Sequence, residues 1–331
     1  MLKRRNINKE PQNISKPEHN TKDEEEEDTK ENNAFVSLDE TTKIKIKTLQ
    51  FDSIVLSAAG TNLFKMLAVL DVLNKNKKIH QITKYIGSSA GAMICLFLLL
   101  DLTPHEIFEK LCQVQFEPLI AGANLSNIYT HSSLLSSNIL VKIIQDIIIS
   151  KIGFDITLAE LFELTKKKLI VTVFNFTDYK IEYVTHETHP HFLCAEIIAA
   201  SCSIPFIFSK LKIHEKFYLD GGVFDNFPLT HFLKNYPHST TCAIVLSDNF
   251  QAKEQIELRN NSTPLSFLID VAWVPNRLNT IKKINKNKDK ENVCIISINS
   301  APSDGLKFHM SSVDKYRIFT TTMKAFKQAL F

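Results

Sequence analysis

Glycine is scarce in this sequence, and its scarcity makes the positions of the few glycines informative. There are 8 glycines in 331 residues, where the ~7% usual in globular proteins would give about 23. Glycine-rich fibrous and low-complexity classes are therefore excluded. Five of the eight lie in three short clusters, at Gly60, at Gly87 and Gly91, and at Gly221 and Gly222. Because glycine permits positive φ angles and close backbone approach, we expect these three turns to carry the chemistry.

Paired cysteines and long apolar segments are also missing. The six cysteines include no C-x-x-C pair and lie mostly in apolar runs, which argues against zinc ribbons and disulfide frameworks. We expect them to be small buried side chains in a reducing compartment. The longest apolar run, residues 90–100, is far shorter than the roughly 20 residues that cross a bilayer. We expect a buried helix there.

The amino terminus and the charge balance exclude two further classes. Residues 1–5 are followed by polar residues, so the apolar core of a secretory signal is missing. Lys and Arg number 39 against 36 Asp and Glu, a net charge of +3, which is too balanced for a nucleic-acid-binding surface. We expect a cytoplasmic protein without a nucleic-acid partner. We also expect peripheral contact with membranes. The basic stretch 282–288 is either a site for anionic lipid or a solvated loop.

The chain divides near residue 49. Residues 1–48 have almost no apolar periodicity and contain the acidic run 23–28, so we expect a disordered charged tail. Residues 49–331 alternate apolar strands with amphipathic helices, which predicts one α/β domain. Its motifs lie within about 49–246, and its C-terminal part is helical with an added strand. Strands are expected at 51–56, 82–86, 169–176, 180–184, 240–246 and 293–298, and helices at 63–73, 132–150, 158–164, 264–284 and 313–330.

The pattern Gly87-x-Ser89-x-Gly91 lies between an apolar strand and an apolar helix. This is the context of a nucleophile elbow, in which a tight turn exposes the serine oxygen and the glycines remove side chains that would collide. The amides at the start of the helix would then face negative charge that develops beside Ser89. The alternative is an ordinary turn in which Ser88 or Ser89 caps the helix.

A second turn, Ser57 to Gly60, also follows a strand and opens a helix. The 29 residues from Gly60 to Ser89 accommodate one crossover helix and one strand, so a right-handed β-α-β unit would bring both turns to the same sheet edge. Backbone amides of Ala58, Ala59 and Gly60 are the candidates for an oxyanion hole, whose loss costs on the order of 3 kcal/mol per donor. An ordinary strand-to-helix turn is the alternative.

A serine nucleophile needs a proton acceptor, and Asp220 is the candidate. It ends an apolar stretch and precedes Gly221 and Gly222, which would let its carboxylate approach another backbone closely. A simple Asp-Gly-Gly turn is the competing interpretation.

The histidines offer a different arrangement. A Ser-His-Asp triad would use one of His231, His238 and His309, none of which lies in a distinctive turn. The group His186, His189 and His191 has spacing that suits neither one helical face nor a zinc finger, so we expect a polar surface loop and no metal site.

Taken together, three segments resemble the patatin-like phospholipase family. The resemblance covers about 49–246, and its segments are Tyr85–Ala92, Ala199–Phe206 and, most specifically, Tyr218–Pro228. It implies a three-layer α/β fold with a central, mostly parallel sheet and a Ser89–Asp220 dyad that needs neither histidine nor metal nor cofactor. It also implies cleavage of acyl esters of phospholipids, lysophospholipids or acylglycerols through an acyl-enzyme, in which Asp220 deprotonates the attacking water.

The first glycine-rich motif departs from the family. Members usually have three consecutive glycines, then one residue, a basic residue and another glycine, whereas this chain has Ala58-Ala59-Gly60-Thr61-Asn62-Leu63. Alanine at a positive φ costs about 1 kcal/mol or more, so we expect a reshaped loop. Three functions therefore compete: a lipid acyl hydrolase that contacts membranes transiently, a catalytically impaired protein that binds lipid or a protein partner, and a Ser-His-Asp esterase.

Overall fold

The computed structural model describes residues 36, 38–114, 132–247, 264–300 and 310–331. In chain order the elements are α2 (Glu40–Thr48), β1 (Ser53–Leu56), η1 (Gly60–Asn62), α3 (Leu63–Lys75), β2 (Lys84–Ser88), α4 (Ala90–Leu99), α5 (Pro104–Cys112), β3 (Ser133–Leu135), α8 (Asn138–Ile152), α9 (Leu158–Thr165), β4 (Lys168–Asn175), β5 (Lys180–Val184), α10 (Cys194–Ser201), β6 (Phe206–Phe208), β7 (Leu211–Ile213), β8 (Lys216–Asp220), η2 (Gly221–Val223), α11 (Leu229–Asn235), β9 (Thr241–Ser247), α13 (Pro264–Asn287), β10 (Val293–Asn299) and α14 (Ser312–Leu330).

The central sheet has the strand order β10-β9-β1-β2-β4-β8-β7, with β5 paired to β4. The five strands from β10 to β4 are parallel to their neighbours, and β5, β8 and β7 pair antiparallel at the other end. β1 is buried along its whole length. Parallel strands covered on both faces need side chains that are apolar on both sides, which is why they appear as continuous apolar runs in the sequence.

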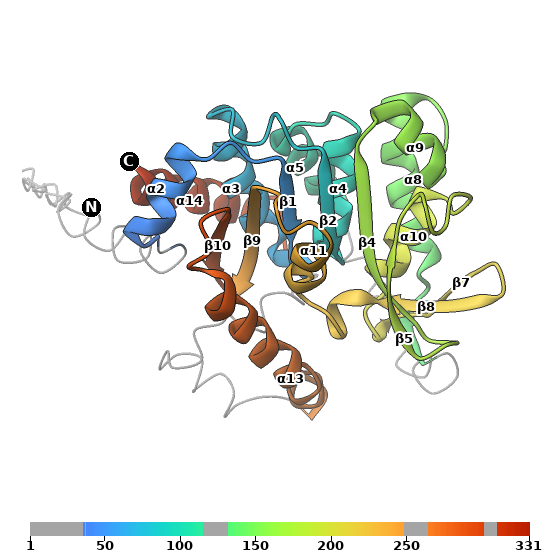
Figure 1. Ribbon diagram of the computed structural model, residues 1–331. Coiled ribbons are helices and arrows are strands. Elements are labelled where there is room, and N and C mark those ends of the chain that lie inside the picture. Colours follow the sequence, from blue (N-terminus) through green and yellow to red (C-terminus); the bar gives the residue numbers. More distant parts are fainter. Residues whose placement is uncertain (1–35, 37, 115–131, 248–263, 301–309) are drawn as a thin grey trace, which may run out of the picture.

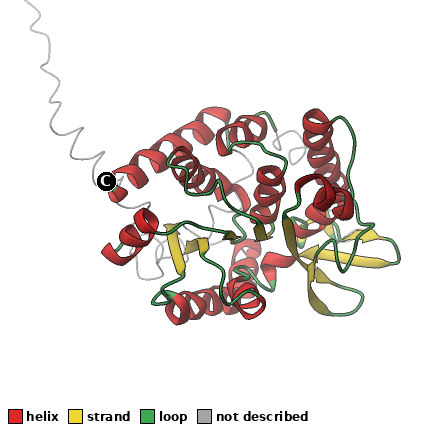
Figure 2. Ribbon diagram, turned by 45° about the horizontal axis from the view of Figure 1, so that its top comes forward, coloured by secondary structure: helices red, strands yellow, loops and turns green. Residues whose placement is uncertain are grey.

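Helices cover both faces of this sheet, giving three layers (Figures 1 and 2). Alternate residues of β1 belong to different clusters. Ile54 and Leu56 belong to a cluster that also contains residues of α3, α4, α5, α10 and α14, whereas Val55 belongs to one that contains residues of α11, with Ile284 of α13 packed against it. This confirms the predicted α/β fold with a mostly parallel sheet. α13 lies beside the carboxyl end of β9, at the lower edge of the sheet in Figure 1.

The ordered chain begins earlier than the expected boundary at residue 49. α2 is N-capped by Asp39, and its Ile46 is buried. Lys45 Nζ donates to three backbone oxygens near the end of α13 and the start of β10, at 2.7–2.9 Å. Val36 also forms a bridge with Ile298 of β10. These hydrogen bonds and the bridge join residues more than 240 positions apart, so no local pattern in the sequence indicates them. The rest of the expected tail, residues 1–35 and 37, lies outside the described residues.

Other differences concern short elements. The expected helix at 132–150 is instead β3 followed by α8, and the expected strand at 82–86 lies two residues later. α5, α10, α11 and the β6, β7 and β8 strands were not predicted as separate elements. The capping box formed by Thr103 and Glu106 at the start of α5 is recognisable in the sequence and predicts the beginning of this helix.

The described residues also bear on the expectations for membrane spans and cysteines. Within them, no helix combines the length and the apolar character that a membrane span requires. All six cysteines are free and buried, as expected for small apolar side chains.

Candidate active site

Ser89 lies in a strained turn between β2 and α4. Its backbone has φ 53° and ψ −129°, a region that non-glycine residues rarely adopt and that is typical of functional turns. The flanking glycines are required by close approach. A Cβ at Gly87 would lie 2.4 Å from the nitrogen of Ala92, and one at Gly91 would lie 2.4 Å from the carbonyl oxygen of Ser57. The sequence pattern therefore reflects a real steric demand.

Sheet register brings Asp220 to this turn. The last residue of β2, Ser88, pairs with Thr172 of β4, and the last residue of β8, Asp220, pairs with the next β4 residue, Val173. β2 is parallel to β4 and β8 is antiparallel to it, so the carboxyl ends of β2 and β8 meet. Ser89 Oγ donates a hydrogen bond of 2.6 Å to Asp220 Oδ2, across 131 residues of sequence.

Asp220 is buried, with 1% of its surface exposed, and it lines the first cavity beside Ser89. Its second oxygen, Oδ1, accepts from the amide of Gly222 at 2.5 Å. Burial raises the pKa of Asp220 to about 7, although hydrogen bonds from Ser89 and from the amides of Gly222 and Val223 oppose this rise. A carboxyl group with this pKa exchanges protons near neutral pH, as a general base must.

The two glycines after Asp220 are also fixed by contact. A Cβ at Gly221 would lie 2.1 Å from the carbonyl oxygen of Thr172, and one at Gly222 would lie 2.5 Å from Cβ of Ala58. The Asp220 turn is therefore wedged between β4 and the Ala58 loop, and neither glycine can carry a side chain without moving backbone or the Ala58 methyl.

The Ala58–Gly60 loop differs from the expectation in two respects. The amide of Ala58 donates to the carbonyl oxygen of Asn226 at 2.9 Å, so it is already occupied. Among the described residues, the amides of Ala59 and Gly60 have no protein acceptor. Gly60 has a positive φ, 53°, whereas Ala58 and Ala59 do not. The alanines therefore impose no left-handed strain, contrary to the expected cost.

Ser201, at the end of α10, contacts Ser89. The sequence did not predict this contact. Its Oγ accepts from the amide of Ser89 at 2.9 Å and donates to the carbonyl oxygen of Thr172 at 2.7 Å. It thus connects the strained turn to β4. The resemblance in the segment 199–206 pointed to this region, but a hydroxyl that bonds backbone has no distinctive sequence pattern.

Two cavities meet at Ser89, and Gly60, Ser89 and Ile204 line both of them. The first has about 630 Å³ of empty space, part of it open to solvent, and its lining combines the polar side chains Asn62, Asn226, Asn276 and Arg277 with apolar ones such as Leu246 and Trp273. The second is larger, with about 810 Å³ of empty space that is likewise partly open to solvent. Its walls are mainly apolar and include Leu63, Phe64, Met93, Leu111, Leu140 and Ile144. Ser89 therefore lies at the junction of a cavity with mixed polar and apolar walls and a cavity with mainly apolar walls.

The histidines lie away from this junction. His231 stacks on Tyr183, with ring centroids 3.4 Å apart, and His238 is exposed. In the described part of the chain, neither forms a hydrogen bond with Ser89 or Asp220. His309 lies outside the described residues.

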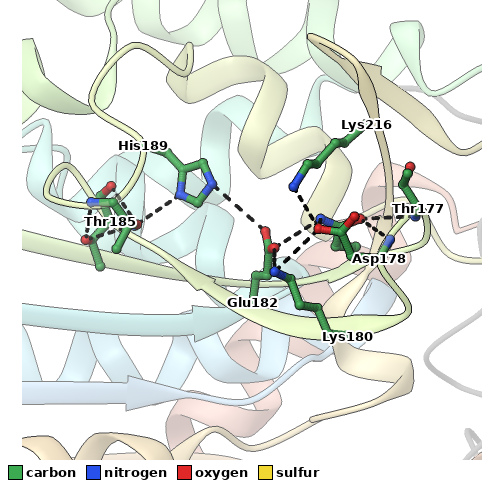
Figure 3. Close-up of polar contacts among 9 residues, drawn as sticks. Thr177, Asp178, Lys180, Glu182, Thr185, His189 and Lys216 are labelled. Atoms are coloured by element: carbon green, nitrogen blue, oxygen red, sulfur yellow. Dashed lines mark hydrogen bonds and ion pairs between the residues drawn. The ribbon is translucent and has the colours of Figure 1, made fainter.

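The group at 186–191 is dispersed over the surface. His186 stacks on Phe162, and His191 is exposed. His189 faces Glu182 at 4.0 Å, next to the ion pairs among Asp178, Lys180 and Lys216 at the β4–β5 hairpin (Figure 3). Among the described residues, no group of three or more His, Cys, Asp or Glu side chains is arranged to hold a metal ion.

The chain is similar in sequence to a known protein family and to two viral proteins. A family model, patatin-like phospholipase, matches residues 54–233. Probable lipid hydrolase 463L of Invertebrate iridescent virus 6 is 34% identical over 195 residues, which are 57% of this chain and 66% of that protein. The match thus covers just under two thirds of that relative. Uncharacterized protein R571 of Acanthamoeba polyphaga mimivirus is 21% identical over 302 residues, 88% of this chain and 98% of that protein.

A solved structure has the same fold. The crystal structure of VipD from Legionella pneumophila superposes with a TM-score of 0.52 at 16% identity, covering 85% of this chain and 67% of that one. At this identity the likeness concerns fold alone, and it agrees with the three layers described above. The family model itself matches more than half of the residues. The chain therefore belongs to the patatin-like phospholipase family.

Proposed function

We propose that this protein is a lipid acyl hydrolase that cleaves carboxylic esters with a Ser89–Asp220 dyad. The observation that carries the proposal is the 2.6 Å hydrogen bond from Ser89 Oγ to a buried carboxylate. A serine hydroxyl is a weak nucleophile unless an adjacent base removes its proton. Asp220, with a pKa raised by burial to about 7, accepts that proton without a histidine.

The reaction proceeds in two halves. Ser89 Oγ attacks the ester carbonyl carbon while its proton passes to Asp220, and the C=O pair moves to oxygen. The amides of Ala59 and Gly60 stabilise this oxyanion. The tetrahedral species collapses, the C–O bond to the alcohol breaks, and Asp220 returns the proton to the leaving alcohol oxygen. Asp220 then deprotonates a water molecule that attacks the acyl-enzyme carbonyl carbon. It returns this proton to Ser89 Oγ as the bond between the acyl carbon and Oγ breaks and the fatty acid leaves.

The unstrained backbone of Ala58 and Ala59 supports a hydrolase over a binding protein without activity. The latter interpretation rested on a loop reshaped by alanine. Two amides beside Ser89 suffice for an oxyanion site, as in serine hydrolases generally. The absence of a basic residue in this loop leaves the stabilisation of charge to backbone dipoles.

The two cavities support a substrate with one apolar and one polar part. The compartment lined by Phe64, Met93 and Ile144 suits an acyl chain. The compartment with Asn62 and Arg277 suits the polar head group. Phospholipids, lysophospholipids and acylglycerols fit this division, and no metal or cofactor takes part in the proposed steps.

Transient membrane contact is part of the proposal, through the outer face of α13. Val274, Leu278, Lys282 and Lys286 follow one another at four-residue intervals, and all are exposed. Residues four apart share one face of a helix. The apolar half of this face is next to cavity residues of the same helix, and the lysines suit anionic head groups.

Fatty-acid release from mixed phospholipid and lysophospholipid vesicles tests the proposal. Ser89→Ala and Asp220→Asn are each expected to abolish release while the protein remains folded. Ser88→Ala is the matched control, because among the described residues its buried hydroxyl has no hydrogen-bond partner. Release that persists in both dyad variants, or no release by the folded wild type from any lipid, would refute the proposal.

A further inference from the structure

α13 contacts the candidate active site with a buried polar face. Asn276, Thr280, Lys283 and Asn287 are all buried and recur at intervals of three or four residues, so they share one side of the helix. This helix lies outside residues 54–233, which match the family model. Polar side chains in such a position need hydrogen-bond partners, and those of Asn276 lie in the Asp220 turn.

Asn276 bonds to two backbone groups of the segment that follows Asp220. Its Nδ2 donates to the carbonyl oxygen of Gly222, and its Oδ1 accepts from the amide of Asn226 at 3.2 Å. One planar amide therefore determines the separation of two points in the loop that carries Asp220.

Both contacts lead on to the reacting groups. Gly222 accepts from Asn276 through its carbonyl oxygen and donates through its amide to Asp220 Oδ1, at 2.5 Å. Asn226, whose amide donates to Asn276, accepts through its carbonyl oxygen from the amide of Ala58 at 2.9 Å. Asn276 thus connects the turn of the base with the loop that holds the candidate oxyanion amides.

A second contact keeps α13 in this place. Lys283 Nζ forms a buried ion pair with Asp225 and donates to the carbonyl oxygen of Phe227 at 2.8 Å. Asp225 also accepts from the hydroxyl of Tyr183 at 2.6 Å. The helix is therefore bound to the 222–227 segment at two points, and Asn276 cannot shift independently.

We propose that Asn276 is a positioning residue that sets the Asp220 turn and the Ala58–Gly60 loop at a fixed separation across Ser89. The expected effect on turnover rests on the proposed hydrolase function, whereas the fixed separation of the two loops does not. Displacement of a catalytic group by about 1 Å is enough to lower turnover by about 100-fold.

Kinetics on a soluble ester provide the first test. With p-nitrophenyl butyrate, Asn276→Ala is expected to lower kcat about 10- to 100-fold with KM changed by less than about twofold. Loss of support for the Gly222 amide weakens a hydrogen bond to the carboxylate, so the loss at pH 6 is expected to exceed that at pH 8 by about threefold or more. Asn287→Ala is the matched control. Asn287 is buried in the same helix, and its Nδ2 donates to the carbonyl oxygen of Lys283.

Hydrogen–deuterium exchange provides the second test, independent of turnover. Asn276→Ala is expected to speed exchange in both 57–62 and 220–228. Asn276→Asp keeps the acceptor for Asn226 but loses the donor to Gly222, so faster exchange is expected mainly in 220–223. Asn287→Ala is expected to change neither segment. If wild type cleaves neither this ester nor any of the lipid vesicles, the hydrolase proposal fails, whereas exchange still decides the role of Asn276. Unchanged exchange in both segments, or equal kcat and pH dependence in Asn276→Ala and Asn287→Ala, would overturn the inference.

Discussion

Replacing Asp220 with Asn removes a buried negative charge from the candidate site, and we expect the variant to be inactive but more stable at alkaline pH. The carboxylate is 1% exposed, and burial raises its pKa to about 7. An asparagine resembles the protonated carboxyl group: its oxygen accepts from the Gly222 amide, and its nitrogen donates to Ser89 Oγ. It therefore retains two hydrogen bonds without the cost of a buried charge.

The magnitude follows from proton linkage. In the unfolded chain an aspartate has a pKa of about 3.9, so between pH 3.9 and 7 the folded protein binds more protons than the unfolded one. Stability from this group is complete below pH 3.9 and is lost as the pH rises through about 7. At about 1.4 kcal/mol per tenfold change in proton affinity, the loss is on the order of 4 kcal/mol. Asp220→Asn does not incur this loss.

Urea unfolding at pH 4.5 and pH 8 measures the difference. The variant is expected to gain about 2–4 kcal/mol over wild type between these two pH values. Asp71→Asn is the matched control. Asp71 is also a buried carboxylate, but it pairs with Lys75 at 2.7 Å, so its removal is expected to lower stability at pH 8. An Asp220→Asn variant that is no more stable than wild type at pH 8, relative to pH 4.5, would contradict the raised pKa.

Further expected outcomes follow from the same site. Because Asp220 acts deprotonated and has a pKa of about 7, kcat/KM is expected to fall to about 1% of its plateau at pH 5; a flat profile between pH 5 and 8 would exclude this base. Gly221→Ala brings a methyl group to 2.1 Å from the Thr172 carbonyl oxygen and is expected to cost about 3 kcal/mol or more in urea unfolding. At Gly153, where φ is +90° and space is open, the same change is expected to cost about 1 kcal/mol, and equal costs would argue against the close contact. Met93→Trp narrows the apolar cavity and is expected to shift the ratio of p-nitrophenyl butyrate to palmitate hydrolysis about tenfold toward butyrate; an unchanged ratio would place the acyl chain elsewhere.

Much of the fold could be predicted from the sequence, because its determinants are local. The central parallel strands are buried on both faces and so appear as continuous apolar runs. In a chain that otherwise avoids glycine, the glycines around Ser89 and after Asp220 mark turns where a Cβ would collide with backbone or a neighbouring methyl. α2 had no such local mark, because Lys45 bonds to carbonyl groups 243–248 residues away.

The sequence by itself therefore determined the fold class and indicated Ser89 and Asp220 as candidates. Buried strands appear in it as apolar runs, and positions where a side chain would collide with its neighbours appear as glycines. Only the tertiary structure decided how they meet. The register that sets the ends of β2 and β8 against adjacent residues of β4 depends on pairing between distant strands. It also decided that the Ala58 amide is occupied and that Ser201 and Asn276 form hydrogen bonds with backbone groups of the site. These contacts join side chains to backbone groups, which every residue possesses, so no sequence pattern distinguishes them.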